Sequence, residues 1–412
     1  MTTAANQDVA QARTERGLKE ILLSSLRHNS KQYTMFLALI AIWVTFSFLT
    51  ESVFLTPRNL SNLFVQTVTT AILAIGMVLV IVTGHIDLSV GSVLGFTGAV
   101  CAMLMIQADW GVVPSVAATL VAGLAIGAWH GFWVAYRRVP AFIVSLASML
   151  AFRGLIIGLT GGQTQGLEMA SEKTAEAFKL IGQGYLPTFG AAAEGQLHDS
   201  SLLVVIGIVL AYVILAWRRR SVRQQFGFDV LPAYAEALKQ AFVSAIILAF
   251  GLIKVVYLGI PWSVVFVLAL MLVFSFLAEN TTFGRHLYAI GGNPDAARLS
   301  GINVPRHTFV LFMLMGLMTA IAGIVYTSRL NAATTSAGSN AELDAIASAV
   351  IGGTSLLGGE GTIFGAIVGA LVMTSLDNGM SLMNLDITYQ YVIKGLILLL
   401  AVWVDMAQRK RA

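Results

Sequence analysis

The chain has 412 residues, of which 57% are hydrophobic and only 11% are charged, whereas about a quarter of the residues in a soluble domain are charged. This composition excludes an ordinary soluble domain and indicates an all-α membrane protein. The formal net charge of +4 does not indicate nucleic-acid binding, because the basic residues form short clusters between apolar runs, a pattern that orients membrane-spanning helices.

Apolar runs long enough to cross ~30 Å of hydrocarbon recur along the chain. The first begins only near Met35, so we expect no cleavable signal peptide. We predict about 10 to 12 transmembrane helices in one membrane domain, residues 34–404, between an N-terminal tail (1–33) and a basic C-terminal tail (405–412). The twelve expected segments are residues 34–50, 63–83, 88–107, 112–136, 140–160, 201–217, 239–258, 261–278, 308–327, 341–357, 362–382 and 387–404.

Two parts of this pattern are irregular. Segments 239–258 and 261–278 are separated by little more than Gly259 and Ile260, which favours a tight helical hairpin. Segment 341–357 contains the pair Gly352 and Gly353, where we expect a broken or re-entrant helix to be interrupted.

If the N-terminal tail is cytoplasmic, every later basic cluster falls on the same side of the membrane. Both termini are then cytoplasmic, residues 161–200 form an external loop, and residues 281–307 form a cytoplasmic loop. Within the external loop, residues 170–182 predict a surface helix, either a lid over the helix ends or a docking surface. The basic clusters are at positions 137–138, 218–220, 223, 285, 298, 306 and 409–411.

The cytoplasmic loop contains "NPDAARLSG", residues 293–301, which predicts a short isolated helix. Asn293 suits the N-cap, Pro294 the first helical position, Asp295 the positive end of the helix dipole, and Gly301 a left-handed residue after the helix. About two turns are marginal alone in water. The pattern therefore predicts a helix that needs a partner surface.

That partner surface is either the lipid headgroups or another protein. The helix is expected to expose Ala296, Ala297 and Leu299 with few basic residues, whereas helices that lie on membranes are rich in Lys and Arg. Docking into a groove of another protein is therefore favoured.

Four stretches carry a family resemblance. "GRHLYAIGGNPDAARLSGINVPR" resembles the coupling-helix loop of ABC-importer permeases of the monosaccharide class, the ribose, galactose and xylose group. "GHIDLSVGSVLGFTG", "PAFIVSLASMLAFRGL" and "AELDAIASAVIGGTSLLGGEGTIFGAIVGALVM" resemble other signatures of that family, in the same order. The extra spans between Arg218 and Ile260 resemble its D-xylose branch most. In place of the small or acidic residue common before the Ile-Asp pair, this chain has His85.

The resemblance implies a type II ABC-importer-like permease of the bacterial inner membrane that imports a monosaccharide by alternating access, with D-xylose favoured. It implies a second permease copy, a separate ABC ATPase subunit, and a periplasmic sugar-binding protein that supplies the sugar affinity. The residues expected to transmit motion from the ATPase are Gly284, Arg285, Gly291, Gly292, Asn293, Pro294, Asp295, Ala296, Ala297, Arg298, Leu299 and Gly301.

No catalytic site is expected in this chain. It has no Gly-Lys dipeptide and so no Walker-type phosphate loop. Its six histidines are scattered, with no metal-ligand cluster. We expect no cofactor on this chain, and ATP and Mg²⁺ on the partner ATPase. His130, inside an apolar run, is expected to be a packing histidine with satisfied ring nitrogens.

Polar residues in the spans are candidates for the translocation path or a gate. An unpaired charge such as that of Arg153 costs at least ~2.5 to 3.5 kcal/mol inside a membrane. We therefore expect Arg153 to line the path or pair at a gate, or else to form a structural ion pair or extend its charged end outwards to the membrane surface. Lys394 poses the same question. The candidates are Asp87, Ser89, Ser92, Arg153, Glu342, Asp344 and Asn378.

Some of these candidates carry finer expectations. Asp87, at a cytoplasmic turn, is expected with Ser89 to cap the helix that follows, in preference to contacting sugar or forming an inner gate. Glu342 and Asp344 are expected at the outer mouth of their segment. Asn378, like its neighbour Asp377, is expected to be structural more than sugar-contacting.

A competing interpretation is a gradient-driven secondary transporter with Asp87, Arg153 and Asp344 as an ion relay. The capped cytoplasmic helix disfavours it, because a gradient-driven carrier does not need one.

Two segments share a four-residue spacing of small side chains, at residues 91, 95 and 99 and at residues 361, 365 and 369. Close packing explains this spacing, and an inverted repeat is left open.

Overall fold

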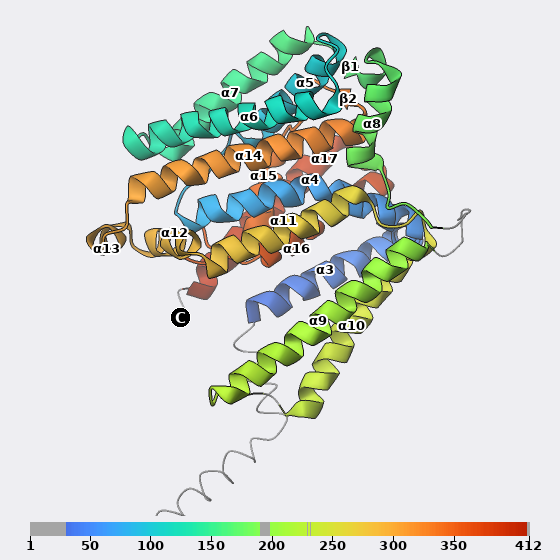
Figure 1. Ribbon diagram of the computed structural model, residues 1–412, viewed down its shortest axis with the longest axis vertical. Coiled ribbons are helices and arrows are strands. Elements are labelled where there is room, and N and C mark those ends of the chain that lie inside the picture. Colours follow the sequence, from blue (N-terminus) through green and yellow to red (C-terminus); the bar gives the residue numbers. More distant parts are fainter. Residues whose placement is uncertain (1–29, 190–197, 229, 231, 410–412) are drawn as a thin grey trace, which may run out of the picture.

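The computed structural model describes residues 30–189, 198–228, 230 and 232–409 (Figure 1). The regular secondary structure of this part of the chain is helical apart from one pair of two-residue strands. Most of the predicted N-terminal tail and residues 410–412 lie outside it. The elements are α3 (Ser30–Leu49), the 3-10 turn η1 (Val53–Leu55), α4 (Pro57–Val82), α5 (Val90–Ile106), α6 (Val112–Gly131), the π-helical turn η2 (Phe132–Tyr136), α7 (Ala141–Thr160), β1 (Gln165–Gly166), the 3-10 turn η3 (Leu167–Met169), α8 (Glu172–Gln183), α9 (Asp199–Gln225), α10 (Ala233–Val256), α11 (Trp262–Asn280), α12 (Thr282–Gly292), α13 (Pro294–Leu299), α14 (Val304–Leu330), β2 (Ala332–Ala333), α15 (Ala341–Ile351), α16 (Ile363–Leu382) and α17 (Ile387–Arg409).

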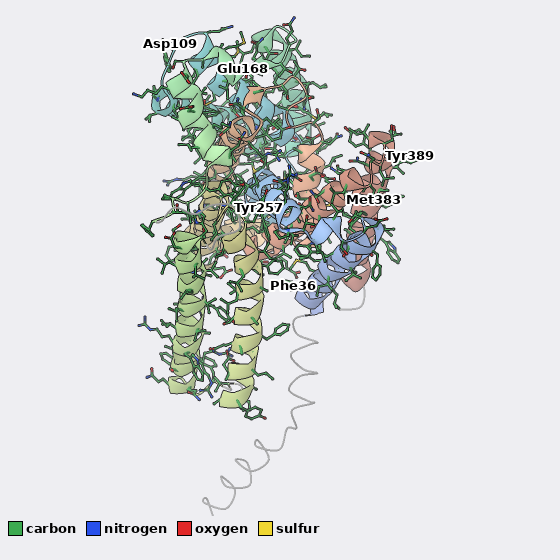
Figure 2. The ribbon with its side chains drawn as sticks, turned by 90° about the vertical axis from the view of Figure 1, so that its right-hand side faces the viewer. Phe36, Asp109, Glu168, Tyr257, Met383 and Tyr389 are labelled. Atoms are coloured by element: carbon green, nitrogen blue, oxygen red, sulfur yellow. The ribbon has the colours of Figure 1, made fainter. Side chains whose placement is uncertain are left out.

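The bundle has two opposite ends, with α12 and α13 at one and α8 at the other (Figure 1). We call these the inner and the outer end, following the predicted topology. Figure 2 faces the outer end, where Asp109, Glu168 and Met383 lie in three different connections between long helices. α3 begins and α17 ends at the inner end, as the prediction of two cytoplasmic termini requires.

Each of the twelve predicted segments contains a helix in the described part of the chain. Eight helices are long and apolar enough to cross a membrane, and α5 and the apolar parts of α3 and α17 are shorter. The remaining segment, 341–357, is broken as predicted: α15 has 11 residues and ends at Ile351, and Gly353 follows with φ of 90°. This crossing therefore combines an irregular segment, residues 331–340, with a half-length helix.

The predicted hairpin of residues 239–258 with 261–278 is wrong. α10 instead runs alongside α9 (Figures 1 and 2), and Gly251 of α10 packs against Val205 of α9. Leu258 and Gly259 both have positive φ angles, 53° and 84°. This left-handed turn redirects the chain, so α11 packs on α4 and α8 instead.

The core of the bundle is α4, with α14, α15 and α16 packed around it. The inner part of α4, residues 71–82, is apolar on every side and fully buried, as expected of a helix without a polar face. The outer end is closed by α8, confirming the predicted surface helix, with Phe178 fully buried. Ser328 Oγ receives the Gly182 N–H at 2.8 Å and donates to Phe178 O at 2.6 Å.

Candidate functional site

The short helix α13 lies at the inner end of the bundle. It starts and stops at the residues that its sequence predicts. Asn293 Oδ1 accepts from the N–H groups of Asp295 and Ala296 at 3.1 and 3.0 Å, and Pro294 is the first helical residue. Gly301 has a φ of 86°, the left-handed conformation that ends many helices. All of these interactions are local, which explains why sequence reasoning found them.

The exposed face of α13 differs from the predicted one at one residue. Leu299 is 86% exposed and Ala296 is exposed, but Ala297 is only 4% exposed. Ala297 faces the bundle, where α13 packs on α12 and α14. Arg298 forms an ion pair with Asp295 at 3.6 Å in solvent. The surface offered to a partner is therefore small and centred on Leu299.

α12 was not anticipated, although its signal is in the sequence: Thr281 caps it by accepting from Gly284 N–H at 3.1 Å. A Cβ at Gly284 would meet the carbonyls of residues 277 and 278, and one at Gly291 would meet Val82 O. These two predicted coupling residues therefore pack α12 against the bundle, so they are not part of a docking surface. Arg285 and Gly292 are exposed.

Side chains of α12 connect it to two further helices. Tyr288 Oη donates to Gly361 O, just before α16, at 2.8 Å. Burial and, to a lesser extent, the negative charge of Glu279 raise the pKa of Tyr288 to about 12, so the hydroxyl keeps its proton. His286 Nδ1 lies 2.9 Å from His307 Nε2 of α14. A displacement of α13 would therefore reach α14 and α16 through α12.

α5 and α15 both begin inside the bundle. The chain reaches α5 from the inner end through residues 83–89 and reaches α15 from the outer end through residues 331–340. A Cβ at Gly91, in the first turn of α5, would meet Gly338 O and the carboxylate of Glu342, in the first turn of α15. Two opposed helix N-termini at mid-depth resemble the substrate sites of transporters with inverted repeats, and both termini carry partial positive charge.

Asp87 does not cap α5, so that prediction is wrong. Its Oδ1 accepts from Ser89 N–H at 2.9 Å and Ser89 Oγ–H at 2.6 Å, and Ser89, the N-cap residue, makes no side-chain capping bond. The carboxylate therefore stabilises the irregular segment before the helix. Asp87 is only 2% exposed, and its Oδ2 lies 4.0 Å from His130 Nδ1.

The segment of Asp87 also lies deeper than the expected cytoplasmic turn. The ring centroid of His85 is 5.9 Å from that of Phe312, which is eight residues, or ~12 Å, into α14. His130 is buried, and its Nε2 has no hydrogen-bond partner in the described chain, so the expectation of a satisfied packing histidine is wrong. A cavity of about 450 Å³, lined by His85, Arg138 and residues 139–142, lies beside this segment.

Arg153 holds the irregular segment before α15. Its Nη1 donates to Ala337 O at 2.9 Å and to Thr335 O at 3.3 Å. These hydrogen-bond partners of Arg153 are backbone carbonyls and not a carboxylate, and its place on the translocation path stays a prediction. Its charge also acts on Glu342, which is 9% exposed and whose Oε2 has no hydrogen-bond partner within the described residues.

Lys394 of α17 joins two carboxylates from other helices, a group we call the ion cluster. Its Nζ lies 2.8 Å from Asp377 Oδ2 of α16 and 3.1 Å from Asp344 Oδ2 of α15. The side chains of Lys394, Asp377 and Asp344 are 18, 33 and 17% exposed, respectively. For Asp344 and Lys394 the cluster indicates a structural role, which ties α15 to α16 and α17.

The remaining candidates are buried. Asn378 Oδ1 accepts from Asn59 Nδ2 at 2.8 Å, and Asn59 Nδ2 also donates to Phe54 O at 2.8 Å. Asn378 therefore connects α16 to the start of α4, which agrees with the structural role expected for it. Ser92 is 0% exposed, and its Oγ has no hydrogen-bond partner in the described part of the chain.

The structure thus brings Arg153 and Glu342 together near the start of α5. Asp87, Arg153 and Asp344 each bind a different set of partners, so the geometry does not join them into the ion relay of the competing interpretation. Among the described residues there is no group of three or more His, Cys, Asp or Glu that could hold a metal ion.

The known proteins that this chain resembles are permease components of transport systems. The family model described as branched-chain amino acid transport system / permease component matches residues 59–402. The xylose transport system permease protein of Escherichia coli (strain K12) is 47% identical over 93% of this chain and 94% of its own length. That of Haemophilus influenzae is 44% identical over 93% and 98%.

The ribose import permease protein of Escherichia coli (strain K12) is 35% identical over 91% of this chain and 92% of its own length. No solved structure matches the chain significantly. The family match covers most of the chain. Together with the xylose permease relatives, the apolar helices make this chain a multi-pass protein of the inner membrane. The chain therefore belongs to the family of permease components of branched-chain amino acid type transport systems.

Proposed function

We propose that this chain is the membrane-spanning subunit of an ATP-driven importer that translocates D-xylose by alternating access. It acts as a pair of permease copies with a separate ATPase, and a periplasmic sugar-binding protein delivers the sugar. The choice of sugar rests on the relatives named for xylose, which are more similar to this chain than those named for ribose.

The observation that carries the coupling proposal is the geometry of α13. It is capped at both ends and presents Leu299, 86% exposed, beyond the inner end of the bundle. A large apolar side chain exposed on a six-residue helix is suited to a pocket on a partner. α12 connects α13 to α4, α14 and α16, so ATP-driven motion of a partner would reach the helices around α5 and α15.

The sugar path in this proposal follows the polar interior. It passes the meeting of α5 with α15, where Arg153 and Glu342 lie, and leaves by the cavity beside His85 and Arg138 at the inner end. The affinity for sugar belongs to the binding protein. ATP and Mg²⁺ belong to the ATPase, so this chain needs no cofactor of its own.

The test is uptake of labelled D-xylose into proteoliposomes that contain the chain, its ATPase and its binding protein. Leu299→Glu should lower ATP-dependent uptake at least ~10-fold, because losing a central interface residue costs ~2 kcal/mol or more. The matched control is Phe226→Glu, which changes a 74% exposed residue just after α9, away from α13, and should leave uptake unchanged.

Two results would change the proposal. Uptake driven by a proton or sodium gradient without the ATPase would replace it with the secondary-transporter alternative. ATP-dependent uptake of D-ribose but not of D-xylose would keep the importer and correct the sugar.

A further inference from the structure

Residues 331–340, which we call the outer segment, cover the start of α5 on the outer side. A Cβ at Gly95 of α5 would meet Ala337 O, and a Cβ at Gly91 would meet Gly338 O. Ala337 and Gly338 are both buried. The backbone of the outer segment therefore lies directly against the backbone of α5.

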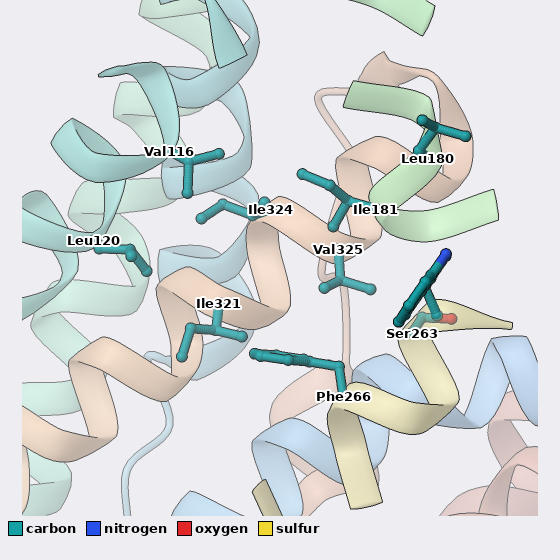
Figure 3. A pocket seen from close by; sticks show the side chains of 10 residues that line it. Val116, Leu120, Leu180, Ile181, Ser263, Phe266, Ile321, Ile324 and Val325 are labelled. Atoms are coloured by element: carbon teal, nitrogen blue, oxygen red, sulfur yellow. The ribbon is translucent and has the colours of Figure 1, made fainter. Parts of the chain in front are cut away.

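The outer segment is fixed at its first residues by the external loop. Asn331 O accepts from Leu167 N–H at 3.0 Å, and β2 pairs with β1 in antiparallel register. α8 packs on the outer part of α14, where Ile181 lies beside Ile324 and Val325 (Figure 3). The chain is therefore anchored as far as the end of β2.

The other end of the outer segment is fixed by α15, whose Asp344 is held by Lys394 of α17. Residues 334–340, between these two anchors, form turns without a regular helix or strand. Asn331 and Asn340 have φ angles of 54° and 62°, a left-handed conformation that asparagine adopts more readily than most residues. Large backbone rotations at a few such positions are what hinges absorb. The outer segment therefore has a residue suited to act as a hinge at each end.

One side chain holds the middle of the outer segment on the bundle. Arg153 Nη1 donates to Ala337 O at 2.9 Å and to Thr335 O at 3.3 Å, and hydrogen bonds from a charged donor are stronger than neutral ones. In the described part of the chain, every other hydrogen bond of residues 334–339 is made within the segment or with the adjoining start of α15. Apart from packing, the position of this stretch on α5 therefore depends on Arg153.

We propose that the outer segment is the outer gate of the translocation path and that Arg153 is the positioning residue that holds it closed. The inference rests on the proposed function, because the sugar path of that proposal passes the meeting of α5 with α15, which the outer segment covers. When Arg153 releases the two carbonyls, residues 334–339 turn away from α5 about the hinges, and water replaces the guanidinium at the carbonyls. The start of α5 is then open to the outer side.

The test is labelling with a membrane-impermeant maleimide added to right-side-out vesicles that contain the full chain. All variants carry Cys101→Ala, because Cys101 is the one cysteine of the chain. Ala337→Cys reports on the gate, since Ala337 is 3% exposed. Its neighbour Ser336 is exposed and Ala74 is buried in α4, so Ser336→Cys and Ala74→Cys are the open and closed controls. With Arg153 present, Ala337→Cys should react at least ~10-fold more slowly than the open control and at least ~10-fold faster than the closed one, as expected of a local opening.

Changes at Arg153 test its role as the positioning residue. Arg153→Gln should raise the rate of Ala337→Cys at least ~10-fold, equivalent to 1.4 kcal/mol. Arg153→Lys keeps a cation with three donors and should stay within ~3-fold of the wild-type rate. The rates of both control positions should not change. A structural role alone would not give this pattern, because loss of the fold would expose Ala74 as well.

Several results would overturn the gate. Reaction of Ala337→Cys as slow as that of Ala74→Cys would show that the outer segment does not open, and reaction as fast as that of Ser336→Cys would show that it is not closed. These comparisons need no change at Arg153, so they decide the question even if Arg153→Gln does not fold. Equal rates of Ala337→Cys with and without Arg153→Gln, or an equal rise at Ala74→Cys, would remove the positioning role.

The labelling distinguishes failure of the gate from failure of the proposed function. It uses no sugar, ATPase or binding protein, so a negative result would leave the importer proposal in place. Uptake of another sugar, or uptake driven by an ion gradient, would change the proposed function without changing the labelling rates.

Discussion

The starts of α5 and α15 are two helix ends inside the same bundle, each beside acidic residues. Asp87, before α5, is held by the N–H and hydroxyl of Ser89, two residues along the chain. Asp344, in the first turn of α15, is held by Lys394, 50 residues away on α17. One helix start is therefore stabilised by its own segment, and the other depends on tertiary contacts.

This difference determines which helix start is linked to the rest of the molecule. The ion cluster joins α15, α16 and α17 through one ammonium group. A buried ion pair contributes little net stability compared with apolar residues, but removing one partner leaves an uncompensated charge. We therefore expect substitutions around α15 to have larger effects than those around α5.

The largest expected effect is that of Lys394→Met. It leaves Asp344 and Asp377 close together without a cation, and we expect the free energy of unfolding to fall by ~3 to 5 kcal/mol. The measurement is denaturant or thermal unfolding of the purified chain in detergent.

The control removes the charges together. Lys394→Met combined with Asp344→Asn and Asp377→Asn should regain most of the lost stability, because no uncompensated charge remains. Unchanged stability of Lys394→Met alone would show that the ion cluster does not hold α15.

A smaller effect is expected where the starts of α5 and α15 touch. Gly91→Ala places a methyl group against Gly338 O and the Glu342 carboxylate, and we expect overpacking to cost ~1 to 3 kcal/mol. Gly154→Ala in α7 is the control, since no atom lies within 4 Å of its added Cβ; it should be neutral or stabilising by up to ~1 kcal/mol. Equal unfolding midpoints for the two variants would mean that α5 and α15 separate readily.

Features set by nearby residues could be predicted from the sequence. Apolar length identified the spans, and the local caps identified α13 and its Gly301 terminus. The break in segment 341–357 followed from its adjacent glycines. Each of these depends on interactions within a few residues, so a single sequence contains the whole signal.

Features set by distant residues could not be predicted. Nothing in the pattern pairs α10 with α9 or brings Lys394 to Asp344, because apolar helices offer many equivalent faces. The depth of Asp87 was missed for a related reason. An irregular segment that enters the bundle has the same polar and glycine-rich composition as a surface turn.

The smallest expected effect is that of Asp87→Asn. The amide oxygen can still accept from Ser89 N–H and Oγ–H, so only the charge-assisted part of these bonds is lost, and we expect a cost of about 1 kcal/mol or less. D-xylose uptake at normal expression should stay above half of the wild-type rate. Asp87→Ala, which leaves both donors unpaired in a buried place, should cost ~1 to 3 kcal/mol. If Asp87→Asn folds normally but abolishes uptake, the charge beside His130 is part of the inner gate, and the start of α5 takes part in transport as directly as the start of α15.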